Sequence, residues 1–498
     1  MPQSEIKLYY KNVMADVIGA EHGISEQQWN ELKKTFEEKE LIPQIMQEIA
    51  GGKRHPGITR TVYGTLPTNG EIADAVMKLV ERFKDRCENL VVFGIGGSAL
   101  GNISLQTALN PFAYNFDDRQ RRGGPCLFVF DNVDPDQLGS FLKSVDNQLD
   151  RTIFNFISKS GRTAETAAQF LLLRNKLTDK YGPEHLAEHL VVTTGFETGK
   201  DGKHSSTFYK IAKASKPELP LLQVPDGVGG RFSVLSAVGL FSAAMCGIDI
   251  EALLAGARAM HERVSRENFE ENPAAINAAI SYHYYMRGKR NSVIMPYSYA
   301  LKDMADWYRQ IWAESLGKSR DLEQNEVFIG PTPIKALGAT DQHSQVQLYR
   351  EGPNDKLFTF LQVENFDYDA EMVMGPQPDC APELSYLAGK KMSVLLNNEK
   401  NATEYALLED KRPCLTVLFD RVNAYSVGQF IYLYEVTTSF AGALFGIDTY
   451  NQPAVELGKE ATFALMGKSG RCDFVGTSYE DFAEKIRSRT KIDDDYLV

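Results

Sequence analysis

The chain has 498 residues, 43% of them hydrophobic and 24% charged, which is typical of a globular protein long enough for two or more domains. Its net charge of −12 argues against general nucleic-acid binding, because that binding relies on a basic surface. A small anionic ligand stays compatible with this charge, since it needs only a local positive pocket.

The cysteines and the apolar segments indicate a cytoplasmic location. Six scattered cysteines have no CxxC or His-partnered metal spacing, which is typical of reduced thiols, so we expect no metal site. Met1–Tyr10 has an acid and lacks the apolar core of a signal peptide. The longest apolar run, Phe232–Ile250, contains three serines and an aspartate, so it predicts a buried helix and no membrane contact.

The first 50 residues predict a helical extension, and His55-Pro56-Gly57 interrupts this pattern. Asn69–Arg86 predicts an amphipathic helix, because apolar residues recur on one of its faces. The strand Leu90–Phe93 then leads into GIGGSALG at Gly94–Gly101, where the glycines permit close approach of the backbone to a ligand.

The glycine loop also matches a dinucleotide fingerprint, Gly94-x-Gly96-x-x-Ala99. A dehydrogenase would place an acid at the end of a strand about 20 residues later. The next strand, Cys126–Phe130, reaches an acid only at Asp131, so the match is weak evidence.

SKSGRTAET, at Ser158–Thr166, lies between the apolar run Thr152–Ile157 and a helical pattern. Unpaired amides and a positive dipole at a helix start suit a phosphate. A simple helix cap needs one hydroxyl, whereas four hydroxyl residues and two cations gather here. The segment therefore favours a phosphate-type anion over a capped helix without a ligand.

Further strands at Leu190–Thr194 and Leu221–Val224 alternate with helices, which predicts a parallel sheet covered on both faces. Gly195–Lys200 is too short for a P-loop. Pro225–Gly239 is predicted to place Arg231 at the start of a long apolar helix. Because a cation is unfavourable there, an anion-facing role is favoured over that of a surface arginine.

The chain is predicted to divide into five segments: a helical N-terminal extension (1–50), a phosphate-binding α/β lobe (51–250), a helical connector (251–290), a second lobe (291–445) and a helical C-terminal arm (446–498). Strands of the second lobe are predicted at Asn291–Met295, Val327–Ile329, Leu357–Val363 and Cys414–Leu418. Asp367–Lys391 is rich in Pro, Gly and acids and predicts a surface excursion.

The helix predicted at Leu301–Gly317 carries a candidate general base. Four of its residues share one face: Met304, Trp307, Ile311 and Glu314. A carboxylate that continues an apolar stripe is suited to act as a base, and the alternative is a solvated acid at the helix end.

Two more residues carry weaker signals. Thr340 or Asp341 can cap a following helix with His343 in its first turn, where the helix dipole favours a neutral imidazole. The alternative is a surface histidine. Lys459 closes NQPAVELGK, and from composition alone it is an ordinary surface lysine.

Six stretches together resemble the glucose-6-phosphate isomerase family, in that family's order and over about residues 90 to 460: GIGGSALG, SKSGRTAET, PDGVGGRFSVLSAVG, AESLGK, GATDQHSQVQ and NQPAVELGK. The resemblance implies an α/β fold with two SIS-type α/β/α lobes and parallel-rich sheets. It also implies a cytoplasmic homodimer with a shared active site, which interconverts glucose 6-phosphate and fructose 6-phosphate in glycolysis and gluconeogenesis without metal or cofactor.

The resemblance further implies which residues bind the hexose 6-phosphate. The family's phosphate clamp falls on Ser158, Lys159, Ser160 and Thr163. Its glycine-rich substrate loop falls on Gly97 and Ser98, and its substrate-contacting amides fall on Gln310 and Gln452. The chain departs from many relatives at Gly161-Arg162, where they carry a bulky or hydroxyl pair, so the role of Arg162 stays open.

For catalysis, the resemblance implies that Glu314 shuttles a proton between C2 and C1 while Arg231 stabilises the enediolate. His343, contributed by the partner subunit, and Lys459 match the pair that opens the sugar ring. Glu165 matches the acid that supports the active-site histidine. Two alternatives stay open: a non-catalytic SIS-type sugar-phosphate sensor, and an isomerase that also acts on mannose 6-phosphate.

Overall fold

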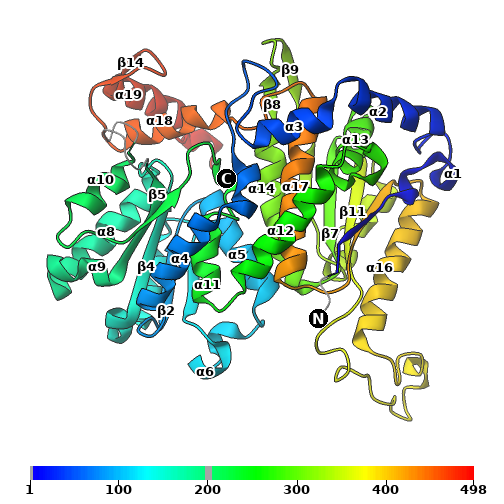
Figure 1. The fold of residues 1–498 in the computed structure, drawn as a ribbon, viewed down its shortest axis with the longest axis horizontal. Coiled ribbons are helices and arrows are strands. Elements are labelled where there is room, and N and C mark those ends of the chain that lie inside the picture. Colours follow the sequence, from blue (N-terminus) through cyan, green and yellow to red (C-terminus); the bar gives the residue numbers. More distant parts are fainter. Residues whose placement is uncertain (1–3, 197–204) are drawn as a thin grey trace. The chain divides into compact units, whose positions relative to one another are not determined.

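The computed structural model describes residues 4–196 and 205–498. The chain forms two compact units, Met1–Thr449 and Tyr450–Val498. The first unit contains two sheets, each the centre of an α/β/α lobe, and Figure 1 shows both. The predicted fold class is therefore confirmed.

The first sheet has five parallel strands in the order β3-β2-β4-β5-β6. Their bounds are β2 Asn89–Phe93, β3 Cys126–Phe130, β4 Thr152–Ser158, β5 Leu190–Gly195 and β6 Leu221–Val224. Every residue of β2 and β4 is buried, because helices cover both faces of the sheet. This is the sheet that the alternating strands and helices predicted.

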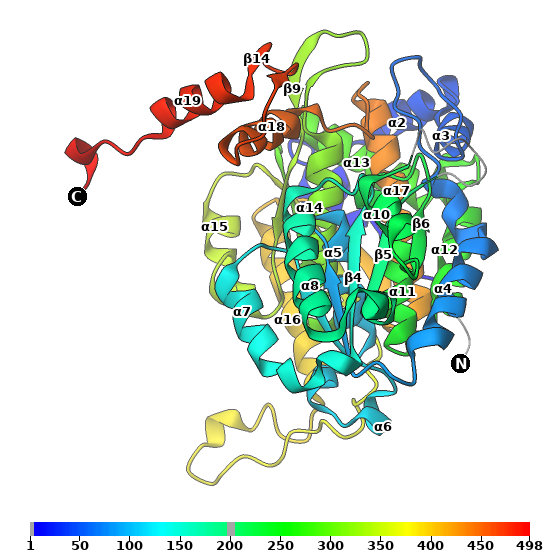
Figure 2. The same ribbon diagram turned by 90° about the vertical axis from the view of Figure 1, so that its left-hand side faces the viewer.

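Two groups of helices enclose the first sheet (Figure 2). Phenylalanines of the sheet pack against one group of helices. For example, the ring centroids of Phe156 in β4 and Phe170 in α8 are 5.1 Å apart. That group comprises α7 Pro135–Ser144, α8 Ala164–Tyr181, α9 Leu186–His189 and α10 Thr207–Ala214. The other comprises α4 Gly70–Phe83, α5 Gly97–Leu109 and α11 Ala237–Met245, while α6 Arg119–Arg122 is a short turn.

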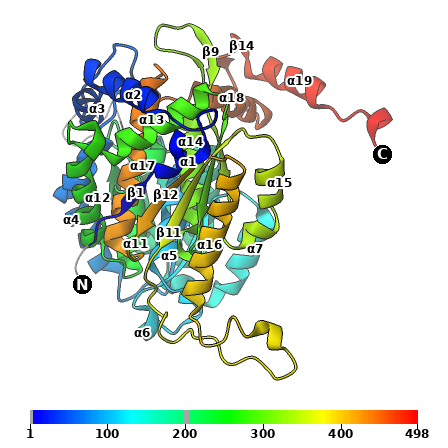
Figure 3. The same ribbon diagram turned by 90° about the vertical axis from the view of Figure 1, so that its right-hand side faces the viewer.

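The second sheet has the order β1-β12-β11-β7-β10, and only β1 runs antiparallel (Figure 3). Its strands are β1 Lys7–Tyr9, β7 Asn291–Pro296, β10 Thr332–Lys335, β11 Lys356–Val363 and β12 Cys414–Phe419. On one face, α15 Val346–Glu351 and α16 Met392–Glu409 contribute Tyr349 and Leu407 to its core.

Long buried helices join the two lobes. α5 packs against α14 Lys302–Leu316, and α17 Ala424–Leu444 packs against α12, α13 and α14. The remaining helices of this unit are α1 Ala15–Ile18, α2 Glu26–Glu38, α3 Leu41–Ile49, α12 Ile250–Val264 and α13 Pro273–Met286. Within the described residues, no helix is both long and apolar enough to cross a membrane.

The structure differs from the predicted elements in four places. The first 50 residues contain the strand β1 as well as helices, and β10 completes the second sheet where no strand was predicted. Val327–Ile329 does form a strand, β9 Glu326–Ile329, but it pairs with β8 Lys318–Arg320 in a separate hairpin. The run Phe232–Ile250 is not one helix, because Ser236 caps a later start and Gly247, at φ +79°, lies in the break before α12.

The predicted surface excursion at Asp367–Lys391 is confirmed, since most of its residues are exposed and it contains only one short helical turn. The second unit contains α18 Glu456–Leu465, the hairpin strands β13 Arg471–Cys472 and β14 Thr477–Ser478, and α19 Tyr479–Thr490. It has its own small core, built around Cys472 and Tyr479.

Candidate active site

The hydroxyl-rich loop follows β4 directly. Ser158 ends the strand, and Thr163 immediately precedes α8. The Ser158 and Thr163 hydroxyls are 2.9 Å apart, and the Gly161 amide donates to the Ser158 hydroxyl at 3.1 Å. Thr163 makes no side-chain cap to α8, so the first-turn amides stay available to an anionic ligand. Glu165 lies in this same first turn and is half-buried.

Lys159 projects from this loop and donates to the Val228 carbonyl at 3.0 Å. Desolvation lowers the pKa of Lys159, while the nearby Asp226 carboxylate opposes this shift and Arg60 adds to it. Arg60 itself pairs with Asp226 at 3.3 Å. Sequence reasoning missed Arg60, because it lies about 100 residues from the loop, without a local motif.

Glycines bring three distant motifs together. A Cβ atom on Gly97 would lie 2.2 Å from the Gly230 carbonyl oxygen, and one on Gly96 would lie 2.8 Å from Nε2 of Gln310. Only glycine permits these approaches, and Gly96 also has φ +55°. Gly97 and the half-buried Ser98 begin α5, so this helix starts against the Gly230-Arg231 turn and the Gln310 side chain.

Glu314 and Arg231 form the centre of the candidate site. Nη1 of Arg231 lies 3.6 Å from Oε1 of Glu314, and Nε2 of Gln310 donates to Oε2 of Glu314 at 3.1 Å. The guanidinium is almost fully buried, with a side chain 2% exposed, whereas the Glu314 side chain is 28% exposed. The carboxylate thus stays accessible to a ligand beside a buried cation.

The predicted setting of Arg231 was wrong. Arg231 lies in the 3-10 turn Gly230–Phe232, and the apolar helix α11 begins only at Ala237. Its guanidinium donates to the Ser315 hydroxyl at 2.6 Å and to the Thr449 carbonyl at 2.7 Å. These hydrogen bonds, and not a helix terminus, hold the buried cation in place.

The predicted stripe on α14 is confirmed up to its last member. Met304, Trp307 and Ile311 are buried, and the helix ends before Gly317 as expected. Glu314 lies at the edge of this stripe and is only partly buried.

His343 is placed differently from its prediction. It ends the 3-10 turn Thr340–His343 and lies before α15, not in the first turn of that helix. Asp341 stabilises this turn by accepting from the Leu337 amide at 2.7 Å and from the Ser344 hydroxyl at 2.5 Å. The His343 side chain is exposed, and it has no hydrogen-bond partner in the part of the chain that the structure describes.

Gln452 and Lys459 belong to the second unit. Gln452 is exposed and precedes the 3-10 turn Pro453–Val455, so Pro453 begins this turn and not α18. Lys459 forms an ion pair with Glu456 at 2.7 Å on α18. No group of three or more metal-binding side chains occurs among residues 4–196 and 205–498.

The comparisons with known proteins point to one family. The family model described as phosphoglucose isomerase matches residues 80–470. The glucose-6-phosphate isomerase of Carboxydothermus hydrogenoformans is 46% identical over 80% of this chain and 83% of its own length. That of Rubrobacter xylanophilus is 41% identical over 83% of this chain and 90% of its own length.

Solved structures agree on the fold. A hypothetical protein from Thermus thermophilus has a TM-score of 0.77 and 31% identity, and the match covers 93% of this chain and 100% of that protein. A glucose-6-phosphate isomerase from Chlamydia trachomatis has a TM-score of 0.75 and 23% identity, with 93% and 88% covered. The chain belongs to the phosphoglucose isomerase family.

Proposed function

We propose that this protein interconverts glucose 6-phosphate and fructose 6-phosphate through a cis-enediol(ate) intermediate. The observation that carries the proposal is the Glu314–Arg231 pair, in which an accessible carboxylate lies 3.6 Å from a buried guanidinium. An aldose–ketose isomerisation needs a base that loses and regains one proton, and a cation that stabilises the enediolate. Glu314 supplies the base, and Arg231 supplies a charge that stays cationic at any working pH.

The phosphate of the sugar binds at the start of α8. Ser158, Ser160 and Thr163 offer hydroxyls, Lys159 offers a charge, and the first turn of α8 offers amides. Gly97, Ser98 and Gln310 would contact the sugar between this phosphate site and Glu314. Arg60 also lies near Lys159, but it is paired with Asp226, whose effect on Lys159 is the larger, so this pair adds no positive potential there.

Ring opening needs acid–base help at the ring oxygen, and for this step we propose His343 of a partner subunit. The exposed position of His343 suits a side chain that serves another copy of the chain. The protein would then be a homodimer with shared active sites, located in the cytoplasm and independent of metal. The roles that the resemblance implies for Glu165, Gln452 and Lys459, and the five predicted segments, stay predictions.

The decisive experiment measures conversion of fructose 6-phosphate in a coupled assay that contains a chelator. We expect turnover by the native protein. In Glu314→Gln, kcat should fall by about 10²- to 10⁴-fold, because the general base is lost, while sugar-phosphate binding persists. The matched control is Glu409→Gln, which changes an exposed acid at the end of α16 and should leave kcat unchanged.

A kcat in Glu314→Gln comparable to the native value would refute the assignment of the base. Binding of hexose phosphates by the native protein without any turnover would indicate the non-catalytic sensor instead. Activity on mannose 6-phosphate is tested by comparing kcat/KM for the two aldose phosphates side by side.

A further inference from the structure

Lys318 contacts the backbone of Glu314, the candidate base. It is the first residue of β8 and is only 8% exposed. Its Nζ donates to the carbonyl of Glu314 at 2.9 Å and to that of Ser315 at 2.8 Å. These carbonyls belong to the last turn of α14, where a helix has no backbone donors of its own to satisfy them. A lysine ammonium is suited to this place, because it supplies both hydrogen bonds and the charge that the helix dipole favours.

Ser315 links this lysine to the guanidinium of the site. Its carbonyl accepts from Lys318, and its hydroxyl accepts from Nε of Arg231 at 2.6 Å. Ser315 is fully buried, so the link is shielded from water. The end of the helix that carries Glu314 and the cation that faces Glu314 are therefore held by one connected set of hydrogen bonds.

Three charged groups surround the Lys318 ammonium: Arg231, Asp448 and Glu314. The pKa of Lys318 is lowered to about 8, first by burial and then by Arg231, while Asp448 and Glu314 oppose the shift. Asp448 also accepts hydrogen bonds from the amide and the hydroxyl of Thr59. The ammonium thus lies among charged groups beside the base, without being exposed to a ligand.

We propose that Lys318 is a positioning residue, which fixes the last turn of α14 so that the Glu314 carboxylate stays aligned with Arg231. The inference rests on the proposed function, because it presumes that Glu314 is the base. Lys318 acts through the backbone of Glu314 and Ser315 and does not touch the substrate. A misplacement of a catalytic group by about 1 Å can reduce the rate by about 100-fold, so a loosened helix end should be visible in kcat.

The test compares Lys318→Met with Lys289→Met. Lys289 is a matched control, since it is also 8% exposed, its pKa is also lowered to about 8, and it donates to a carbonyl, that of Asn354, at 3.0 Å. It lies in the second lobe, between α13 and β7. Both variants should lower Tm. Only Lys318→Met should lower kcat, by about 10- to 100-fold, with KM changed by less than about threefold.

The pH–rate profile separates positioning from mere stabilisation. Loss of the Lys318 cation should move the acidic limb of kcat/KM to higher pH by about half a unit or more, because a nearby carboxylate loses a favourable charge. Lys318→Arg retains the charge and the donors, so it should restore the native limb and part of kcat. Lys289→Met should leave the profile unchanged.

The inference is overturned if folded Lys318→Met keeps native kcat and the native profile, or if Lys289→Met loses as much turnover. Should Lys318→Met fail to fold, Lys318→Gln decides, because its shorter, neutral side chain cannot supply the charge and both hydrogen bonds to the carbonyls of Glu314 and Ser315; native kcat together with the native profile in that variant would equally overturn the inference. A native protein without turnover, or an active Glu314→Gln, would instead refute the proposed function and this inference with it.

Discussion

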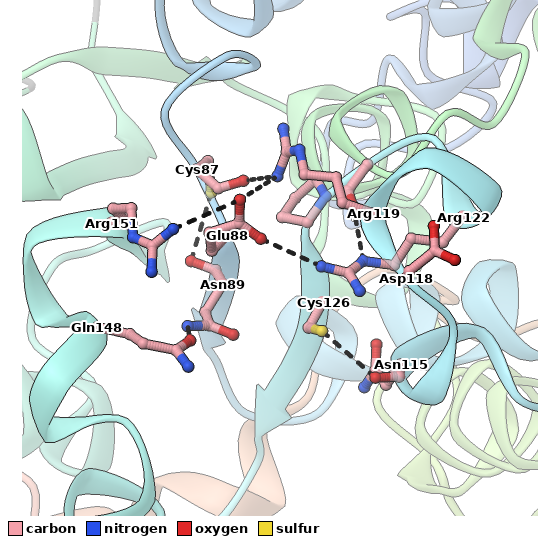
Figure 4. A network of polar contacts seen from close by, with 12 residues as sticks. Cys87, Glu88, Asn89, Asn115, Asp118, Arg119, Arg122, Cys126, Gln148 and Arg151 are labelled. Atoms are coloured by element: carbon pink, nitrogen blue, oxygen red, sulfur yellow. Dashed lines mark hydrogen bonds and ion pairs between the residues drawn. The ribbon is translucent and has the colours of Figure 1, made fainter.

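The two ends of the first sheet are both rich in polar residues, but they are built in opposite ways. At the carboxyl end, hydroxyls, glycines and Lys159 gather around the start of α8, where they make hydrogen bonds, but Lys159 forms no ion pair within the described residues. At the amino end, one carboxylate, Glu88, forms ion pairs with Arg119, Arg122 and Arg151 at 3.8, 3.3 and 3.9 Å (Figure 4).

The same close-up shows how completely the groups at the amino end are paired. Nδ2 of Asn89 donates to Gln148 at 2.9 Å, Arg119 donates to the Cys87 carbonyl, and Arg122 donates to backbone carbonyls as well as to Glu88. A cluster of charged residues is thus not sufficient to mark a ligand site. The difference lies in ion pairing, because cations that a protein carboxylate already neutralises have less to gain from an anionic ligand.

The largest expected difference between the two ends is in substrate binding. Lys159→Ala, at the carboxyl end, should raise KM for the phosphorylated sugar by about 10- to 100-fold, because one charge-assisted hydrogen bond to the phosphate is lost. The control Lys176→Ala removes a partly exposed lysine of α8 that pairs with Asp146, and it should leave KM unchanged. An unchanged KM in Lys159→Ala would place the phosphate elsewhere.

At the amino end of the sheet, we expect a substitution to lower the free energy of unfolding and to leave substrate binding unchanged. In Glu88→Ala, three arginines lose their shared carboxylate, and we expect unfolding free energy to fall by about 1–2 kcal/mol, since all four side chains are partly exposed or near the surface. Denaturant unfolding measures this loss, and steady-state kinetics should show native kcat and KM. A large change in KM would erase the distinction between the two ends.

The smallest expected effect concerns His189, at the amino end of β5. His189 is 4% exposed, its ring nitrogen lies 3.4 Å from the Thr152 carbonyl, and desolvation lowers its pKa. Below pH about 6.5 the unfolded chain therefore binds more protons than the folded one, so stability falls with decreasing pH, by at most about 1.4 kcal/mol per pH unit.

Urea unfolding of the native protein and of His189→Gln at about pH 5.5 and about pH 7.5, on either side of the usual histidine pKa, checks this effect. The native protein should lose more stability on acidification than the variant does. Equal losses would mean that other groups set the pH dependence of this end of the sheet.

The sequence predicted the buried strands correctly, and also the half-buried edge strands of the first sheet, β3 and β6. Thr152–Ile157 and Leu190–Thr194 are continuous apolar or β-branched runs, and such runs identify central parallel strands. The missed strands, β1 and β10, lie at the two edges of the second sheet. β10 contains Pro333 and Lys335, which an edge strand tolerates but which conceal its pattern.

For the site, the sequence by itself determined the local geometry: the loop at the end of β4, the glycines before α5 and the face of α14 that ends in Glu314. These features depend on turn chemistry and helical period, which act over a few residues. Only the tertiary structure decided that Arg231 is buried against Glu314 and that Lys318 holds the helix end. The Arg231 contact joins segments that lie far apart in the chain. Lys318 follows Glu314 by only four residues, but its burial beside Arg231 and Asp448 depends on how whole elements pack, which no local pattern encodes.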